Sequence, residues 1–339
     1  MAARLRPGAG AAIALVAASA ALAGAPGRGA AEGRPRYGGT VIASLLSEPI
    51  SLDPVRARSH AEAAVAALIY DALYRLDAGG APVPHLATSL PVVSATELRV
   101  AIRAGVTFHD GSALAASDVA RSLDRARTEV SGVLPGVRAI RADGGDVVLT
   151  LTRRADADAA TELAIALAAA PTSVTPGGAA PKAKAIIGSG PFRFASIDRK
   201  KRRLKLAAAA GHFAGPPYLD ALELRWFDSE DEESRAYEAG VSDVSVRGSV
   251  AFAGHQPKYA TDEIKSPATL LIYIGFGKDH AEVTGNLDVR LALSAAIARS
   301  GFTGTGSGER VVPAVLPLAV DHGGAAAAAA ELAARPDEA

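Results

Sequence analysis

The sequence predicts an α/β fold of mixed sheets with flanking helices, arranged in two compact units. Three observations support this prediction. The 339 residues are 49% apolar and 21% charged, a composition typical of globular proteins. Apolar residues recur with the period of a strand in some segments and of a helix in others. The chain is also about twice as long as the roughly 150 residues of an ordinary domain.

Five segments have the pattern of β-strands. Apolar residues at alternate positions predict half-buried strands at 98–102 and 147–151. A short β-branched run after two glycines predicts a strand at 40–43. The same alternation predicts later strands around 204–206 and 222–226.

Three segments have the pattern of amphipathic helices. Apolar residues on one face predict a helix over 65–76, which Gly79-Gly80 would end. Ser117 is expected to cap a second helix, with Asp118 near the positive end of the helix dipole. A third helix is expected to begin at Asp288. Its predicted buried face consists of Val289, Leu293, Ala296 and Ile297.

The first 23 residues have the features of a secretory signal peptide. Arg4 and Arg6 precede an apolar run over 11–23, which ends in the small residues of Ala21-Leu22-Ala23. This run is shorter than the about 20 apolar residues of a transmembrane helix. We expect residues 24–36 to form a disordered linker after cleavage. Without cysteine there is no site for a lipid anchor, so the expected product is a soluble periplasmic protein and not a lipoprotein.

Charge and cysteine content exclude several classes of function. Lys+Arg and Asp+Glu both number 36, which argues against nucleic acid or an anionic membrane as a partner. The lack of cysteine excludes disulfides, thiolate nucleophiles and zinc–thiolate sites. The seven histidines show no ligand spacing along the sequence, so neither a metal site nor another cofactor is predicted.

Four polar or glycine-containing motifs are interpreted as structural. His109-Asp110 and Gly188-Ser189-Gly190 are predicted to form turns. The basic residues 200–203 are predicted to connect two strands of a hairpin, and the acidic residues 228–233 to begin a solvated helix. No nucleophile, base and orienting group occur together, so we expect no enzyme.

A series of short motifs occurs in one order along the chain. The first five are Tyr37-Gly38-Gly39-Thr40, Ser51-Leu52-Asp53-Pro54, Ile69-Tyr70-Asp71-Ala72-Leu73-Tyr74, Pro82-Val83-Pro84-His85-Leu86-Ala87 and Phe108-His109-Asp110-Gly111. The later ones are Gly188-Ser189-Gly190-Pro191-Phe192-Arg193-Phe194, Gly215-Pro216-Pro217-Tyr218-Leu219-Asp220, Tyr237-Glu238-Ala239-Gly240 with Asp243-Val244, and Asp288-Val289-Arg290-Leu291-Ala292-Leu293. Together they resemble the peptide/nickel-binding family (family 5) of extracytoplasmic solute-binding proteins of ABC transporters.

The resemblance implies a two-lobed periplasmic-binding-protein-like fold that captures a solute between its lobes. An oligopeptide or similar small solute would then be delivered to an ABC importer permease in the membrane. Closure of the lobes is the whole mechanism, so no catalytic group is needed. A complete receptor of this kind is expected to be a monomer.

The resemblance also implies domain bounds. Lobe I would comprise residues 37–52 and 187–243, with an inserted subdomain over 53–186. Residues 244–339 would form part of lobe II and end in a Gly/Ala-rich stretch. Family members continue well beyond the helix at Asp288, so the second lobe is expected to be incomplete.

Three residues are expected to contact the solute, because of their positions relative to the family. Arg58 lies in a loop that faces the cleft in the family, where an arginine can bind a carboxylate through two hydrogen bonds. Arg247 follows the point where the family crosses between lobes, and Tyr273 lies where the family lines the second lobe. The same residues can instead belong to a solvated loop and a packed strand.

Two alternatives remain open on the sequence alone. The chain can be a truncated relative without ligand trapping, acting as a sensor or interaction module, or a non-functional fragment. A secreted hydrolase is the third class, and the chain offers it no catalytic set.

Overall fold

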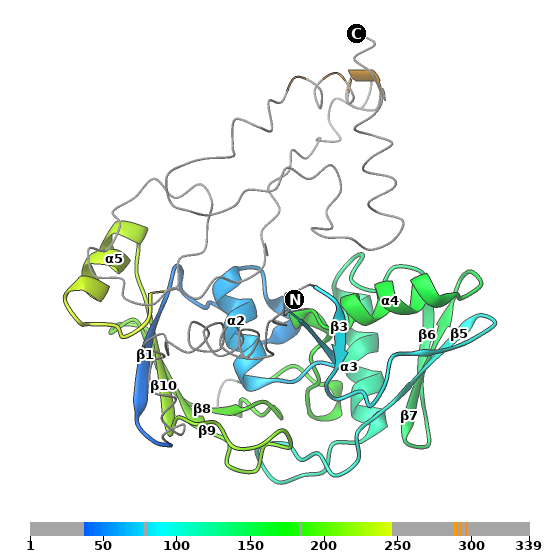
Figure 1. The fold of residues 1–339 in the computed structure, drawn as a ribbon, viewed down its shortest axis with the longest axis horizontal. Helices are drawn as coiled ribbons and strands as arrows, with labels where there is room; N and C mark the ends of the chain where they lie inside the picture. Colours follow the sequence, from blue (N-terminus) through cyan, green and yellow to red (C-terminus); the bar gives the residue numbers. More distant parts are fainter. Residues whose placement is uncertain are drawn as a thin grey trace, which may run out of the picture. The chain divides into compact units, whose positions relative to one another are not determined.

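The computed structural model describes residues 37–77, 80–182 and 185–245, and five single positions between 286 and 296 (Figure 1). Arg247 and Tyr273 lie outside the described residues, as do the signal peptide and linker expected over 1–36. In the described part, no helix is long and apolar enough to cross a membrane.

The first sheet joins the start of the described chain to its later part. Its strand order is β1-β10-β9-β8, with β1 parallel to β10 and the other pairs antiparallel. The four strands are β1 (Thr40–Leu45), β8 (Phe192–Asp198), β9 (Arg203–Ala208) and β10 (Ala221–Trp226). The outer edge of β1 is covered by residues 243–244, since Ser44 N–H donates to Val244 O at 3.0 Å. A mixed sheet was expected and is present.

The second sheet is antiparallel throughout, in the order β4-β5-β7-β6. Its strands are β4 (Val92–Ser94), β5 (Glu97–Ala101), β6 (Val137–Asp143) and β7 (Asp146–Leu151). Helix α3 (Ala116–Glu129) packs on β6 and β7 (Figure 1). This region also contains a hairpin of β2 (Tyr74–Leu76) and β3 (Pro82–Pro84). Helix α4 (Ala157–Ala166) and two short 3-10 helices, η2 (Ala170–Thr172) and η3 (Pro176–Gly178), follow along the chain.

The five predicted strands are confirmed as β1, β5, β7, β9 and β10. In β5, β9 and β10 the alternating apolar residues are buried, in β7 the intervening Val148 is buried as well, and in β1 residues 41–43 are half-buried. Leu98, Val147 and Leu149 are fully buried in the second sheet, and Leu204 and Leu206 in the first. The period of two predicted them because each sheet has one face on a core.

Two hydrophobic cores lie under the two sheets. One contains Leu204, Leu206 and Trp226 of the first sheet together with apolar residues of α2 (His60–Ile69). The other contains the inward faces of the second sheet, α3 and α4. Tyr70 belongs to the first core and Leu73 to the second, so the chain passes from one to the other over residues 70–73.

The helix predicted over 65–76 is placed wrongly. Helix α2 begins at His60, where Ser59 and Glu62 form a capping box, and ends at Ile69. Tyr70 has extended backbone, and its buried phenol donates to Leu52 O at 3.0 Å. The apolar spacing continues through Leu73, but Leu73 packs in the second core. The apolar spacing therefore continues past the end of α2, across the point where the chain leaves the first core and enters the second.

The expected cap of α3 is also wrong. The N-cap is Ala115, whose N–H donates to Asp118 Oδ2 at 2.8 Å. Ser117 lies inside the first turn and does not cap it. The Asp118 carboxylate, and not the expected serine hydroxyl, accepts a hydrogen bond from a backbone N–H at the start of the helix.

The predicted His109-Asp110 turn is confirmed, since Gly111 N–H donates to Phe108 O at 2.9 Å, and the chain bends at residues 189–190. Residues 199–202 connect β8 to β9, so Arg203 of the basic run is the first residue of β9, and helix α5 (Glu230–Glu238) begins after the N-cap Ser229. Glu233 is buried and not solvated, because its carboxylate accepts hydrogen bonds from Ser44 Oγ and Ser245 Oγ.

The helix expected at Asp288 lies mostly outside the described residues. Asp288, Val289, Ala292 and Ala296 are helical. Ala296 is exposed and Val289 half-buried, so Ala296 does not have the predicted burial.

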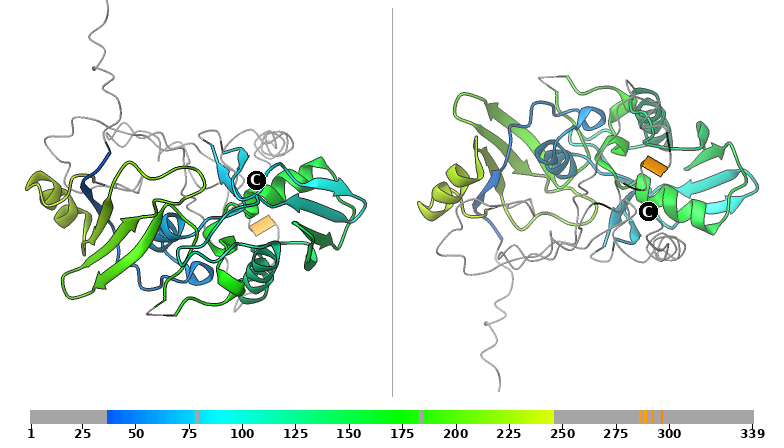
Figure 2. Two further views of the ribbon diagram at one scale, coloured as in Figure 1. Left: turned by 90° about the horizontal axis from the view of Figure 1, so that it is seen from below. Right: turned by 90° about the horizontal axis from the view of Figure 1, so that it is seen from above.

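The helix η1 (Pro54–Arg56) and the loop after it join β1 to α2, as Figure 2 shows from two further sides.

Candidate functional site

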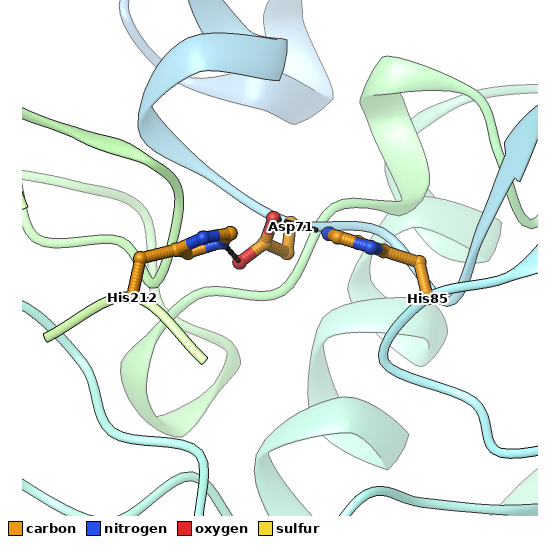
Figure 3. A group of neighbouring side chains, drawn as sticks. All are labelled: Asp71, His85 and His212. Atoms are coloured by element: carbon orange, nitrogen blue, oxygen red, sulfur yellow. Dashed lines mark hydrogen bonds and ion pairs between the residues drawn. The ribbon is translucent and has the colours of Figure 1, made fainter. Parts of the chain in front are cut away.

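Three buried polar side chains meet where the two cores adjoin. Asp71 follows α2, His85 follows β3, and His212 lies in the loop between β9 and β10. Figure 3 shows the Asp71 carboxylate between the two imidazoles. Their side chains are 0%, 8% and 4% exposed, respectively. Burial of three such polar groups requires that they satisfy one another or a ligand.

Backbone hydrogen bonds fix the position of each of the three residues. Val174 N–H donates to Asp71 O at 2.9 Å, and His85 N–H donates to Leu73 O at 3.0 Å. His212 N–H donates to Ala209 O at 3.0 Å, within a turn. The three side chains are therefore held by segments that are well ordered before any ligand arrives.

The two imidazoles contact the carboxylate differently. His85 Nε2 lies 2.7 Å from Asp71 Oδ1, which is a hydrogen bond. His212 Nε2 lies 3.4 Å from Asp71 Oδ2, and neither of these two buried atoms has a hydrogen-bond partner among the described residues. Arg75 Nη2 lies 3.4 Å from Asp71 Oδ1 and is half-exposed. Among the described residues, the contact of Asp71 Oδ1 with His85 is thus a hydrogen bond, whereas the contact of Asp71 Oδ2 with His212 is not.

The carboxyl of Asp71 is ionised in this environment. Burial by itself would raise its pKa, but the neighbouring imidazoles of His212 and His85 stabilise the anion more strongly. The pKa of Asp71 is consequently held well below its usual range. The two oxygens of an ionised carboxylate can only accept hydrogen bonds or bind a metal ion, and in this site each of them faces one imidazole.

Aromatic and cationic groups enclose the cluster. The Phe213 ring lies 4.9 Å from the His85 ring and 4.7 Å from the His212 ring, measured between centroids. The Arg103 guanidinium lies 5.3 Å from the centre of Phe213 and donates to His85 O at 3.0 Å. The cluster is therefore shielded from water, which strengthens its electrostatic interactions.

His109 lies outside this cluster and holds a glycine turn. Gly188 N–H donates to His109 Nδ1 at 3.2 Å, and His109 Nε2 lies 2.9 Å from Gly190 O. These contacts assign the proton of the neutral ring to Nε2. Burial lowers the pKa of His109, which keeps it neutral. A structural role for the His109-Asp110 turn was expected and agrees with these contacts.

The predicted solute-contacting residues are not brought together by the described structure. Arg58 is exposed in the loop between η1 and α2, and its N–H donates to Glu62 Oε2 at 2.7 Å. No described residue forms an ion pair or hydrogen bond with its guanidinium. Arg247 and Tyr273 lie outside the described residues, so all three assignments stay predictions.

Sequence reasoning missed the Asp71, His85 and His212 cluster. Asp71 and His85 are 14 residues apart, and His212 lies far along the chain, in the loop between β9 and β10. None of these separations matches a local ligand motif. The sequence clue was that all three residues lie in or next to the ordered motifs that carry the family resemblance. Those motifs do not predict that the three side chains are in contact.

The fold is shared with solved solute-binding proteins. The oligopeptide-binding protein AppA from Bacillus subtilis, in complex with a nonapeptide, is 22% identical with a TM-score of 0.53, over 62% of this chain and 44% of AppA. The binding protein AgaA from A. tumefaciens R10, in complex with agropinic acid, is 26% identical with a TM-score of 0.52, over 61% of this chain and 43% of AgaA.

The family follows from the sequence as well. The family described as bacterial extracellular solute-binding proteins, family 5 Middle, matches residues 81–339. The chain therefore belongs to family 5 of the bacterial extracellular solute-binding proteins. The uncharacterized protein YhjP from Bacillus subtilis (strain 168) is 29% identical over 187 residues, which are 54% of this chain and 31% of YhjP. The chain thus spans less than half the length of these relatives.

Proposed function

We propose that this protein binds a peptide-like solute outside the cytoplasm and delivers it to the permease of an ABC importer. Membership of the family 5 solute-binding proteins is the observation that carries the proposal. The shared fold with AppA, whose structure contains a nonapeptide, supports the choice of a peptide-like solute. Delivery of a solute to an importer from outside the cytoplasm requires export, which the signal peptide predicted over 1–23 would provide. The role requires no catalysis.

The domain organisation of this proposal follows the family. Residues 37–52 and 187–243 form lobe I, residues 53–186 an inserted subdomain, and residues 244–339 belong to lobe II. The first sheet contains strands from both parts of the proposed lobe I, which supports this division. Helix α2, although within 53–186, packs in the core of that same sheet. We therefore expect α2 to move with lobe I during closure.

We assign the first solute contact to Arg58. Its guanidinium has no described partner, while the loop that carries it is fixed at both ends. Glu62 accepts from the Arg58 and Ser59 N–H groups, and Arg125 binds the Asp53 carboxylate through two hydrogen bonds. A guanidinium without a partner among the described residues, on a loop held at both ends, is suited to bind a peptide carboxylate through two hydrogen bonds. Arg247 and Tyr273 are proposed as further contacts.

A thermal-shift screen of the full chain tests this proposal. Di- to pentapeptides, nickel complexes and small sugars would be added separately, because a ligand at 100 times its Kd stabilises by about 2.7 kcal/mol. We expect stabilisation by peptides alone. Arg58→Ala should weaken that stabilisation, whereas Arg138→Ala, a matched exposed arginine on β6, should not. Equal responses of the two variants would refute the assignment of Arg58, and no response to any peptide would favour a sensor or interaction role.

A further inference from the structure

We propose that Asp71, His85 and His212 bind one divalent transition-metal ion, with zinc the best match, as a structural ion. The three donor atoms, one carboxylate oxygen and two imidazole nitrogens, lie within 4.8 Å of one another. All three side chains are buried. The inference is independent of the solute that the protein carries.

The unsatisfied side of the cluster has the spacing of two ligands on one ion. Zinc binds imidazole nitrogen and carboxylate oxygen at about 2.0–2.2 Å, which places two ligands of a tetrahedral ion about 3.4 Å apart. Asp71 Oδ2 and His212 Nε2 lie 3.4 Å apart, and neither has a hydrogen-bond partner among the described residues. A shared ion would satisfy these two buried atoms, whose contact among the described residues is the 3.4 Å pair that they form with each other.

His85 supplies the third donor. Its Nε2 is held 2.7 Å from Asp71 Oδ1 and would exchange this hydrogen bond for a bond to the ion, with the proton of the neutral ring then on Nδ1. Two neutral imidazoles and one carboxylate form a donor set that suits zinc and related ions, while magnesium and calcium prefer oxygen ligands alone. The Asp71 carboxylate neutralises half of the ion's charge in this enclosed position.

The location indicates a structural rather than a transported ion. Asp71 lies on the segment that passes between the two cores, His85 follows the β2–β3 hairpin, and His212 lies in the loop between β9 and β10 of the first sheet. One ion bound to all three would join segments that are otherwise connected only by packing and hydrogen bonds. Phe213 packs on both imidazoles, so the ion would exchange slowly with solvent.

The test is a calorimetric titration of the metal-stripped full chain with zinc chloride. We expect one ion per chain, with micromolar or tighter affinity, and a rise in Tm when zinc is added. His212→Phe removes one donor and keeps a ring against Phe213, so it should weaken zinc binding at least tenfold. His60→Phe, at an exposed histidine of α2, is the matched control and should bind zinc like the wild type.

The result does not depend on how well His212→Phe folds. Cobalt added to the metal-stripped wild type should give the visible absorption of tetrahedral coordination, and zinc should displace it. Absence of saturable zinc binding by the wild type would overturn the proposal. Zinc binding by a folded His212→Phe variant with wild-type affinity would overturn it as well, since the ion would then be bound elsewhere.

Discussion

Replacement of Gly188 by alanine should destabilise the protein strongly. A Cβ at this position would lie 2.0 Å from Ile69 O, whereas ordinary contacts of this kind are 3.4–4 Å. The two nearest atoms, O and C of Ile69, belong to the backbone and cannot rotate away, and Tyr70 Cδ1 lies 2.8 Å from the added Cβ as well. The Gly188 segment must therefore move by about 1.4 Å from the end of α2, or α2 must shift.

The size of the effect follows from the hydrogen bonds at this contact. Gly188 N–H donates to His109 Nδ1, His109 N–H donates to Gly188 O at 2.8 Å, and Gly190 N–H donates to Ile69 O at 2.9 Å. A movement larger than 1 Å would break all three. At about 1 kcal/mol each, the expected loss is about 3 kcal/mol of unfolding free energy.

Urea unfolding measures this loss directly. Trp226 is the only tryptophan and is buried in β10, so its fluorescence reports unfolding of the first sheet. Gly145→Ala is the matched control, because nothing lies within 4 Å of its added Cβ. We expect the control to stay within about 0.5 kcal/mol of the wild type. A Gly188→Ala variant as stable as the control would refute the close approach of this turn to α2.

Three further predictions test the fold by the same unfolding assay. Ser59→Ala should cost about 1 kcal/mol, while Ser117→Ala should cost less than half of that, because only Ser59 caps its helix; equal costs would contradict the reassigned cap. Arg125→Met should cost about 3 kcal/mol, since it leaves the buried Asp53 carboxylate without its main partner; a cost below about 1 kcal/mol would contradict this. Burial lowers the pKa of His109 below its ordinary value of 6.5, so the unfolded chain takes up a proton there first and stability should fall as the pH decreases below 6.5. His109→Gln should lose this part of the pH dependence, and an unchanged pH profile would contradict it.

Strands were more predictable than helices because of how their side chains are buried. Each predicted strand has one face on a core, so alternate positions such as Leu204 and Leu206 report burial directly. Helix α2 ends at Ile69 because the chain there crosses to the second core, while Leu73 continues the apolar spacing. Local periodicity contains no information about which core a residue joins.

Contacts between distant segments were not predictable from the sequence. The need for glycine at 188 comes from the carbonyl of Ile69, and the burial of Glu233 comes from Ser44 on β1. The cluster of Asp71 with two histidines likewise depends on the loop between β9 and β10 reaching the end of α2. These are consequences of the fold, and the motifs supplied only the residue types.

The central claim is that this member of family 5 binds a peptide-like solute, and calorimetric titration of the full chain tests it most directly. Peptides that raise the Tm in the screen would be titrated into the wild type, Arg58→Ala and Arg138→Ala. We predict saturable binding of one peptide per chain with micromolar or tighter affinity, weakened by Arg58→Ala alone. Absence of saturable binding for every peptide would contradict the proposed function.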